Sequence, residues 1–251
     1  MLDRSLRILN FDDSLIQQKK VLSAFPAQII DCRDLGPKVR LWMDKQSRIQ
    51  ITERLKSSSK NSPTFIGSGD FHHISNILMD QFTENFSLIV FDFHPDWDIL
   101  PPRMACGSWV TQSLKRKNIL KIILIGVSSC DISTWFIQTA NLSSLGNNRL
   151  EIYPYAHPPT RVFFKKIPEN HSVMIKKFFG GAKIYWQELQ KQNLGAFFLS
   201  VFKRLPAKQV YLSIDKDCLK KEDACTNWEE GLLSLGQLLE MLKLIKENLE
   251  I

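Results

Sequence analysis

Two carboxylates and a histidine directly follow an apolar segment in the middle of the sequence. Ser87–Phe91 (SLIVF) is too short for a helix and rich in strand formers, so it predicts a β-strand. Asp92, His94 and Asp96 follow at alternate positions, and alternate side chains of an extended chain share a face. If the strand continues through them, they converge at its end. Because unpaired buried charge is costly, this pattern favours a bound divalent cation. The alternative is a solvated acidic turn that caps the next helix.

Two other segments repeat this order of an apolar run followed by potential ligands. The run VYLSI leads into Asp215 and Asp217, again at alternate positions. The run TFI leads into the glycine-rich segment GSGDFHH, which contains His72 and His73. In open α/β sheets, binding sites form outside the carboxyl ends of the strands. We therefore expect three strands to deliver ligands to one site.

The order of these motifs resembles that of the ureohydrolase superfamily, which includes arginase, agmatinase and formimidoylglutamase. The motifs are GxGDxHH, DxHxD and SxDxD, and the likeness extends from about Phe65 to Gly231. It implies an α/β fold, a three-layer α-β-α sandwich with a mainly parallel sheet. The family pattern places one histidine directly after the aspartate, whereas Phe71 intervenes here. We prefer His72 to His73 as the ligand, because Ser75 then stands where the family has a small residue.

The resemblance also implies a centre of two Mn²⁺ ions per chain. One ion would be held by His72, Asp92, Asp96 and Asp215, and the other by Asp92, His94, Asp215 and Asp217. Carboxylates with one or two imidazoles suit manganese better than zinc, which favours sulfur and nitrogen ligands. The resemblance further implies that a hydroxide bound to both ions hydrolyses a non-peptide C–N bond in a guanidino, formimino or amide group of a small molecule. The alternatives are a deacetylase-like amidohydrolase with one Zn²⁺ and a catalytically silent metal-binding relative.

Three features bear on the substrate. Asp131 ends the segment IGVSSCD, which resembles an arginase segment whose last aspartate contacts the substrate's amino group, but it fits a helix N-cap equally well. Cys106 stands where arginases have a proton-shuttling histidine, and a thiol can move protons only if its pKa is lowered. The family's further strand and a substrate-binding glutamate would follow the last helix, whereas the sequence ends at Ile251. The resemblance therefore leaves the substrate open.

The sequence as a whole is typical of one globular α/β domain covering residues 1–251. Its 251 residues are 44% hydrophobic, which is enough for a substantial core. Short apolar strands alternate with helical patterns, which indicates a parallel sheet with helices on both faces. The segment 156–182 contains the pairs PP and GG, which favours loops. The five cysteines form no CxxC pair and are expected to be reduced thiols.

Charge and hydropathy exclude several functional classes. The formal net charge is +7, but the lysines and arginines are spread out without a zinc-finger spacing or a basic helix. We interpret them as a solvated exterior and not as a nucleic-acid surface. No apolar run approaches a membrane span and the N-terminal residues lack a signal core, which predicts a cytoplasmic protein without a membrane partner. The sequence leaves open whether the chain forms a homo-oligomer.

Overall fold

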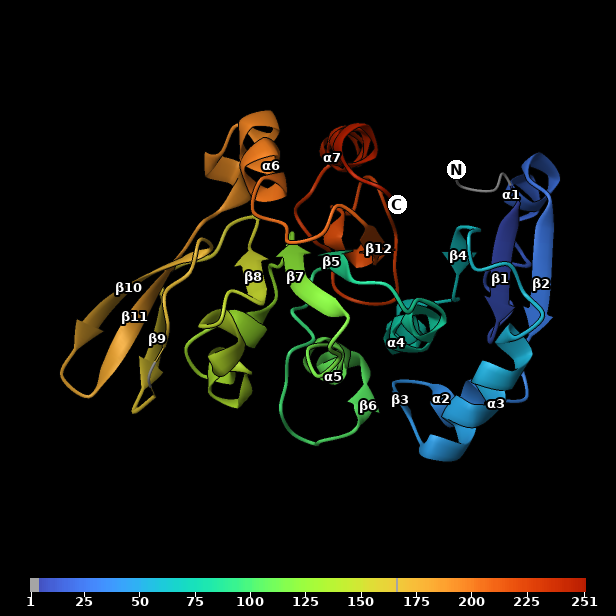
Figure 1. Cartoon of the computed structure of the whole chain (residues 1–251), viewed down its shortest axis with the longest axis horizontal. Helices are drawn as coiled ribbons and strands as arrows, with labels where there is room; N and C mark the ends of the chain where they lie inside the picture. Colours follow the sequence, from blue (N-terminus) through green and yellow to red (C-terminus); the bar gives the residue numbers. More distant parts are fainter. Residues whose placement is uncertain (1–4, 166) are drawn as a thin grey trace.

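Seven parallel strands form the framework of the protein. The computed structural model describes residues 5–165 and 167–251. Its parallel strands form a sheet of order β2-β1-β4 and a sheet of order β12-β5-β7-β8 (Figure 1). They are β1 (Leu6–Asn10), β2 (Ala27–Asp31), β4 (Thr64–Phe65), β5 (Phe86–Phe91), β7 (Ile119–Ile125), β8 (Leu150–Tyr153) and β12 (Val210–Ile214). The parallel pairing confirms the expected fold class, although the strands fall into two groups.

Seven α-helices accompany these strands in the described part of the chain. They are α1 (Lys19–Ala24), α2 (Gly36–Val39), α3 (Lys45–Leu55), α4 (Ser75–Leu78), α5 (Trp109–Ser113), α6 (Leu194–Phe202) and α7 (Leu235–Asn248). The last helix begins at a capping box, in which Ser234 Oγ accepts a hydrogen bond from Gln237 N and Gln237 Oε1 accepts one from Ser234 N. None of the helices in the described residues is long and apolar enough to cross a membrane.

The four-stranded sheet lies between two hydrophobic cores. Leu88 and Val90 of β5 belong to the core that also contains α5 residues, whereas Ile89 and Phe91 belong to the core under α6 and α7. Strands that are apolar on both faces are typical of a parallel sheet covered on both sides. Figure 1 accordingly shows α6 and α7 on one side of this sheet and α4 and α5 on the other. The predicted three layers are therefore present.

The segment 156–182 is where the sequence-based prediction was wrong. It contributes to a third sheet of order β10-β11-β9, whose strands β9 (Thr160–Phe163), β10 (Val173–Phe178) and β11 (Gly181–Trp186) are antiparallel. Gly180 makes the turn between β10 and β11 with a φ of +80°, a conformation that side chains other than glycine rarely adopt. The glycine pair thus marks a hairpin. A two-stranded antiparallel ribbon of β3 (Trp42–Met43) and β6 (Met104–Ala105) completes the strands.

Candidate metal centre

The strands β5 and β12 deliver two of the three motifs to the same edge of the sheet. They pair in parallel with Phe91 opposite Ile214, so both strands end at the same level. Asp215 N then donates a hydrogen bond to Phe91 O at 2.8 Å, which holds the two segments together just beyond the strands. The third motif lies in a 3₁₀ helix, Gly69–Ile74, that precedes α4. Parallel register thus explains why segments far apart in sequence meet.

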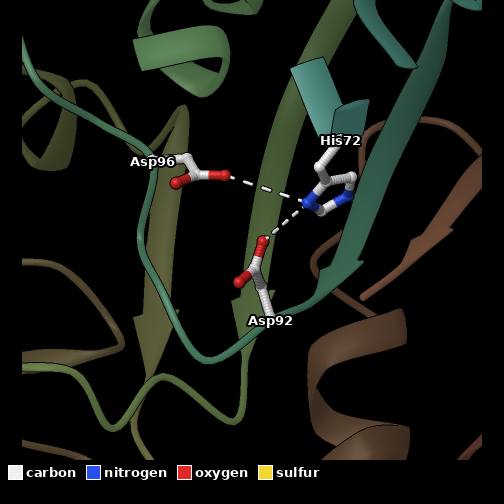
Figure 2. Close-up of side chains that lie close together, drawn as sticks. All are labelled: His72, Asp92 and Asp96. Carbon is white, nitrogen blue, oxygen red and sulfur yellow. Dashed lines mark ion pairs between the residues drawn. The ribbon is translucent and has the colours of Figure 1, made fainter. Parts of the chain in front are cut away.

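The first group of ligand-type side chains surrounds His72. Its Nδ1 atom lies 2.9 Å from Asp92 Oδ2, 3.5 Å from Asp215 Oδ2 and 3.8 Å from Asp96 Oδ2. Figure 2 shows His72 pointing toward Asp92 and Asp96 from the opposite side of the site. The other ring nitrogen, Nε2, is 2.8 Å from Ser213 Oγ. Ser213 therefore holds the ring so that Nδ1 faces the carboxylates.

The second group surrounds His94. Its Nδ1 atom lies 3.2 Å from Asp217 Oδ2 and 3.7 Å from Asp92 Oδ1. Its Nε2 atom lies 3.2 Å from Glu229 Oε2, and the Trp228 ring stands edge-on to the imidazole at 5.5 Å between centroids. His94 is therefore oriented like His72: its Nδ1 atom faces aspartates, and its Nε2 atom contacts a side chain that holds the ring in place.

Asp92 is common to both groups and contains an oxygen that lacks a hydrogen bond. Oδ1 accepts a hydrogen bond from His94 N at 2.8 Å. Oδ2 is buried, and its close polar neighbour is His72 Nδ1, with which it makes an ion-pair contact at 2.9 Å. Such an atom is costly in a protein interior unless something else neutralises it. The groups His72–Asp92–Asp96 and Asp92–His94–Asp217 are each close enough to hold a metal ion, so the residues fit a cation.

The titration of these groups points to the same shortage of positive charge. Burial and repulsion from Asp92 raise the pKa of Asp96 well above its usual value and raise that of Asp217 to about 7. Burial also lowers the pKa of His94, but Asp217 and Asp92 outweigh this effect and raise the pKa to about 12. The raised pKa values mean that these two aspartates and His94 bind protons more tightly than usual, because the buried aspartates bring an excess of negative charge into the site. A divalent ion would supply the missing positive charge.

The convergence does not arise from the extended strand that the sequence suggested. The strand ends at Phe91, and the following residues form a turn in which Asp96 has a φ of +46°. Trp109 Nε1 donates a 2.6 Å hydrogen bond to Asp96 Oδ2, and Val110 N donates one to Asp96 O at 3.0 Å, so α5 contacts both the side chain and the backbone of this residue. The prediction that the strand continues was therefore wrong, because the turn folds Asp96 back toward His72.

The structure also separates the two neighbouring histidines. His72 faces the carboxylates, whereas His73 Nδ1 lies 3.3 Å from Cys106 Sγ. Burial raises the pKa of the Cys106 thiol and lowers that of His73 to about 3, so both groups are neutral near pH 7. The Cys106 thiol also donates a hydrogen bond to Asp70 O at 3.1 Å. This environment gives no support to proton transfer by Cys106. All five cysteines are free.

A pocket of about 320 Å³ opens above the two groups. The six predicted ligands line it together with Cys106, and three further acidic residues stand at its wall: Asp98, Asp131 and Glu229. Ser129 Oγ donates a 2.8 Å hydrogen bond to Asp131, while burial and the nearby Asp131 raise the pKa of Asp98. No lysine or arginine is among the described residues that line the pocket. The pocket is therefore electronegative.

Trp228 and Glu229 also line the pocket, although no sequence pattern singled out either residue. Trp228 Nε1 donates a hydrogen bond to Asp70 Oδ1 at 3.0 Å, which anchors the loop beside the site. Glu229 reaches His94 as described above. The signal that could have found them is the segment 226–232, which, like the three motifs, resembles a ureohydrolase segment. No periodicity or motif spacing distinguishes Glu229 from the adjacent Glu230.

Comparisons with known proteins support the fold. No family model matches this chain. An uncharacterised protein of Thermotoga maritima is 22% identical over 243 residues, which cover 97% of this chain and 75% of that protein. This similarity does not indicate an activity, because the relative is itself uncharacterised.

Two solved enzymes have a similar structure. Proclavaminate amidino hydrolase from Streptomyces clavuligerus has a TM-score of 0.57 at 9% identity, covering 97% of this chain and 78% of the enzyme. Formimidoylglutamase from Bacillus subtilis also has a TM-score of 0.57, at 14% identity, covering all of this chain and 78% of the enzyme. The chain is thus structurally similar to ureohydrolases, at a sequence identity that establishes the fold alone.

Proposed function

We propose that this ureohydrolase-like chain is a metal-dependent hydrolase that uses two Mn²⁺ ions to cleave a non-peptide C–N bond. The observation that carries the proposal is the position of Asp92. One of its carboxylate oxygens faces His72 and the other faces His94, so a single side chain belongs to both ligand groups. Two adjacent cations that share a carboxylate explain this arrangement better than one ion does.

The donor atoms favour manganese. Four aspartates and two histidines converge, and no cysteine belongs to either ligand group among the described residues. With the proton on Nε2, His72 and His94 donate to Ser213 and Glu229, which leaves each Nδ1 lone pair free for an ion. Two bound Mn²⁺ ions would lower the pKa of a water molecule and stabilise negative charge that develops on the substrate.

The remaining pocket residues would select and position the substrate. Asp98, Asp131 and Glu229 offer three carboxylates, which suits a substrate that carries a guanidinium, amidinium or ammonium group. The volume of about 320 Å³ suits a small molecule. Trp97 and the loop residue Trp228 add aromatic surface to the lining of the pocket. Asp131 would bind a distal amino group, as the resemblance implies.

The test is turnover by protein reconstituted with Mn²⁺. We expect release of urea, formamide or ammonia, respectively, from at least one member of a panel of guanidino, formimino and amide compounds. Asp131→Asn should raise KM for a substrate with a distal amine by about tenfold and change it little for the matching compound without the amine. Metal binding without turnover of the panel would favour a silent relative. Turnover only with one Zn²⁺, on acylated amines, would favour the deacetylase-like alternative.

A prediction concerns Glu229, which we expect to position His94. Glu229→Ala should weaken Mn²⁺ binding by about 10- to 100-fold, because partners that orient a metal-bound histidine contribute that much. Glu229→Gln keeps an oxygen acceptor for Nε2 and should retain most of the affinity. Isothermal titration calorimetry measures both values.

The neighbouring residue supplies a matched control. Glu230 contacts Lys221 at 3.8 Å and does not line the pocket. Glu230→Ala should therefore leave Mn²⁺ affinity unchanged. An affinity that falls equally in the two alanine variants would mean that loop stability, and not the contact with His94, is responsible.

A further inference from the structure

The free end of the antiparallel sheet displays phenylalanines to solvent. Phe164, Phe178 and Phe179 surround the Gly180 turn, and we call them the aromatic tip. Phe164 is 92% exposed and Phe179 is fully exposed, whereas large apolar side chains are normally at least partly covered. Phe164 N donates a hydrogen bond to Gly180 O at 3.1 Å, which keeps the loop after β9 beside the hairpin. Figure 1 shows this end of β9, β10 and β11 at the periphery of the molecule.

A row of cations crosses the sheet directly behind the aromatic tip. Lys176 pairs with Lys183, and Lys183 pairs with Arg161, so three positive side chains lie side by side on adjacent strands; we call them the basic row. Like charges at directly opposite positions destabilise a sheet. Glu169 is the only acidic residue between Thr160 and Trp186 in the sequence. The row therefore lacks a counter-charge within its own sheet.

We propose that the aromatic tip and the basic row bind the surface of an anionic lipid bilayer. The phenylalanines would enter the boundary between headgroups and acyl chains, and the basic row would contact lipid phosphates and carboxylates. The order along the sheet fits this arrangement, since the apolar side chains lie at the end and the cations lie behind them. Such contact needs no membrane-spanning segment, so it is compatible with the absence of one from the described helices.

Two other occupants fit these residues less well. Single-stranded nucleic acid needs aromatic ring faces open beside the cations. On the face with the basic row, the ammonium groups of Lys176 and Lys183 already lie 5.1 and 5.3 Å from the Tyr185 ring. A symmetric dimer through this face would place one basic row against another, because a twofold interface brings the same patch from both copies together. An anionic bilayer can contact both the aromatic tip, through its acyl chains, and the basic row, through its headgroups.

The experiment is flotation of the full chain with vesicles. We expect binding to phosphatidylcholine vesicles that contain about 30% phosphatidylserine, and weak binding to vesicles of phosphatidylcholine alone. Phe164→Ser combined with Phe179→Ser should lower the partition coefficient by roughly tenfold for each residue. Lys176→Gln combined with Lys183→Gln should lower it by about fivefold for each residue and weaken the dependence on phosphatidylserine, since Arg161 alone remains of the basic row. All four residues are at the surface, so circular dichroism should be unchanged.

Matched controls lie elsewhere on the surface. Phe25 is about half exposed, and Lys243 and Lys246 are exposed on α7, so Phe25→Ser and Lys243→Gln with Lys246→Gln should bind vesicles like the unaltered protein. Equal loss in the control variants, or no flotation of the unaltered protein, overturns the proposal. So does a dimer in analytical ultracentrifugation that the Phe164 and Phe179 changes dissociate. If an oligonucleotide displaces the protein from anionic vesicles, and a change at Tyr185 abolishes this displacement, the membrane proposal is overturned in favour of nucleic-acid binding.

Discussion

Asp92→Asn is expected to lower the hydrolysis rate of the Mn²⁺-loaded protein by about a thousandfold or more. Metal-centred stabilisation contributes several kcal/mol to the transition state, and about 4 kcal/mol corresponds to three factors of ten. Asp92 contributes an oxygen to each ligand group, so its replacement affects both proposed ions at once. Asparagine has nearly the same shape, which should keep the buried turn folded. Steady-state kinetics and elemental analysis of the same preparation measure the rate and the metal content.

A structural carboxylate provides the control for Asp92. Asp80 contacts Arg48 and Arg116 and does not line the pocket. Asp80→Asn should therefore alter stability and leave both metal content and rate nearly unchanged. If Asp92→Asn retained full metal content and full activity, Asp92 would have no part in the chemistry.

Glu151→Leu is expected to lower the free energy of unfolding by about 3–5 kcal/mol, more than any other substitution proposed for this protein. Glu151 of β8 is fully buried, and Lys121 Nζ of β7 lies 2.6 Å from its Oε1. Removing the carboxylate leaves the buried Lys121 ammonium without its partner, and it also removes the acceptor of Tyr153 and Arg204. Adding Lys121→Met should restore part of the loss, because it removes the uncompensated ammonium, whereas Arg204 loses the carboxylate and keeps its hydrogen bond to Tyr153. Urea unfolding measures all three free energies.

The pH dependence gives a second test of Glu151. Burial raises its pKa, but Lys121, Tyr153 and Arg204 outweigh burial and hold the pKa below its ordinary value of 4.5. A depressed carboxyl pKa stabilises the fold above the ordinary value, and this contribution is lost as the pH falls below 4.5. The difference between the unaltered protein and the double variant should therefore shrink with acidification. Glu247→Leu, at an exposed pair with Lys243, should change stability by about 0.5 kcal/mol or less.

The sequence was informative where strands end in charged residues. Apolar runs before Asp92 and Asp215 predicted β5 and β12, and the rule that sites lie beyond the carboxyl ends of parallel strands brought the motifs together. The chain indeed gathers His72, His94 and the four aspartates around one pocket. Whether they bind manganese remains a prediction.

The sequence was less informative where tertiary contacts determine the backbone. The left-handed conformation of Asp96 accompanies hydrogen bonds from Trp109 and Val110, which no local pattern reveals. The β10–β11 hairpin was hidden because glycine pairs are common in loops as well as in tight turns. Glu229 lies on an irregular loop, where neither helical nor strand periodicity indicates which side chain faces the pocket.

Diffraction from crystals of the Mn²⁺-loaded protein, recorded at the manganese absorption edge, tests the central claim most directly. We expect two anomalous peaks about 3.5–4 Å apart. One peak should adjoin His72 Nδ1, the other should adjoin His94 Nδ1, and the Asp92 carboxylate should lie between them. A single peak, or peaks away from these two histidines, would contradict the binuclear centre and the hydrolytic function built on it.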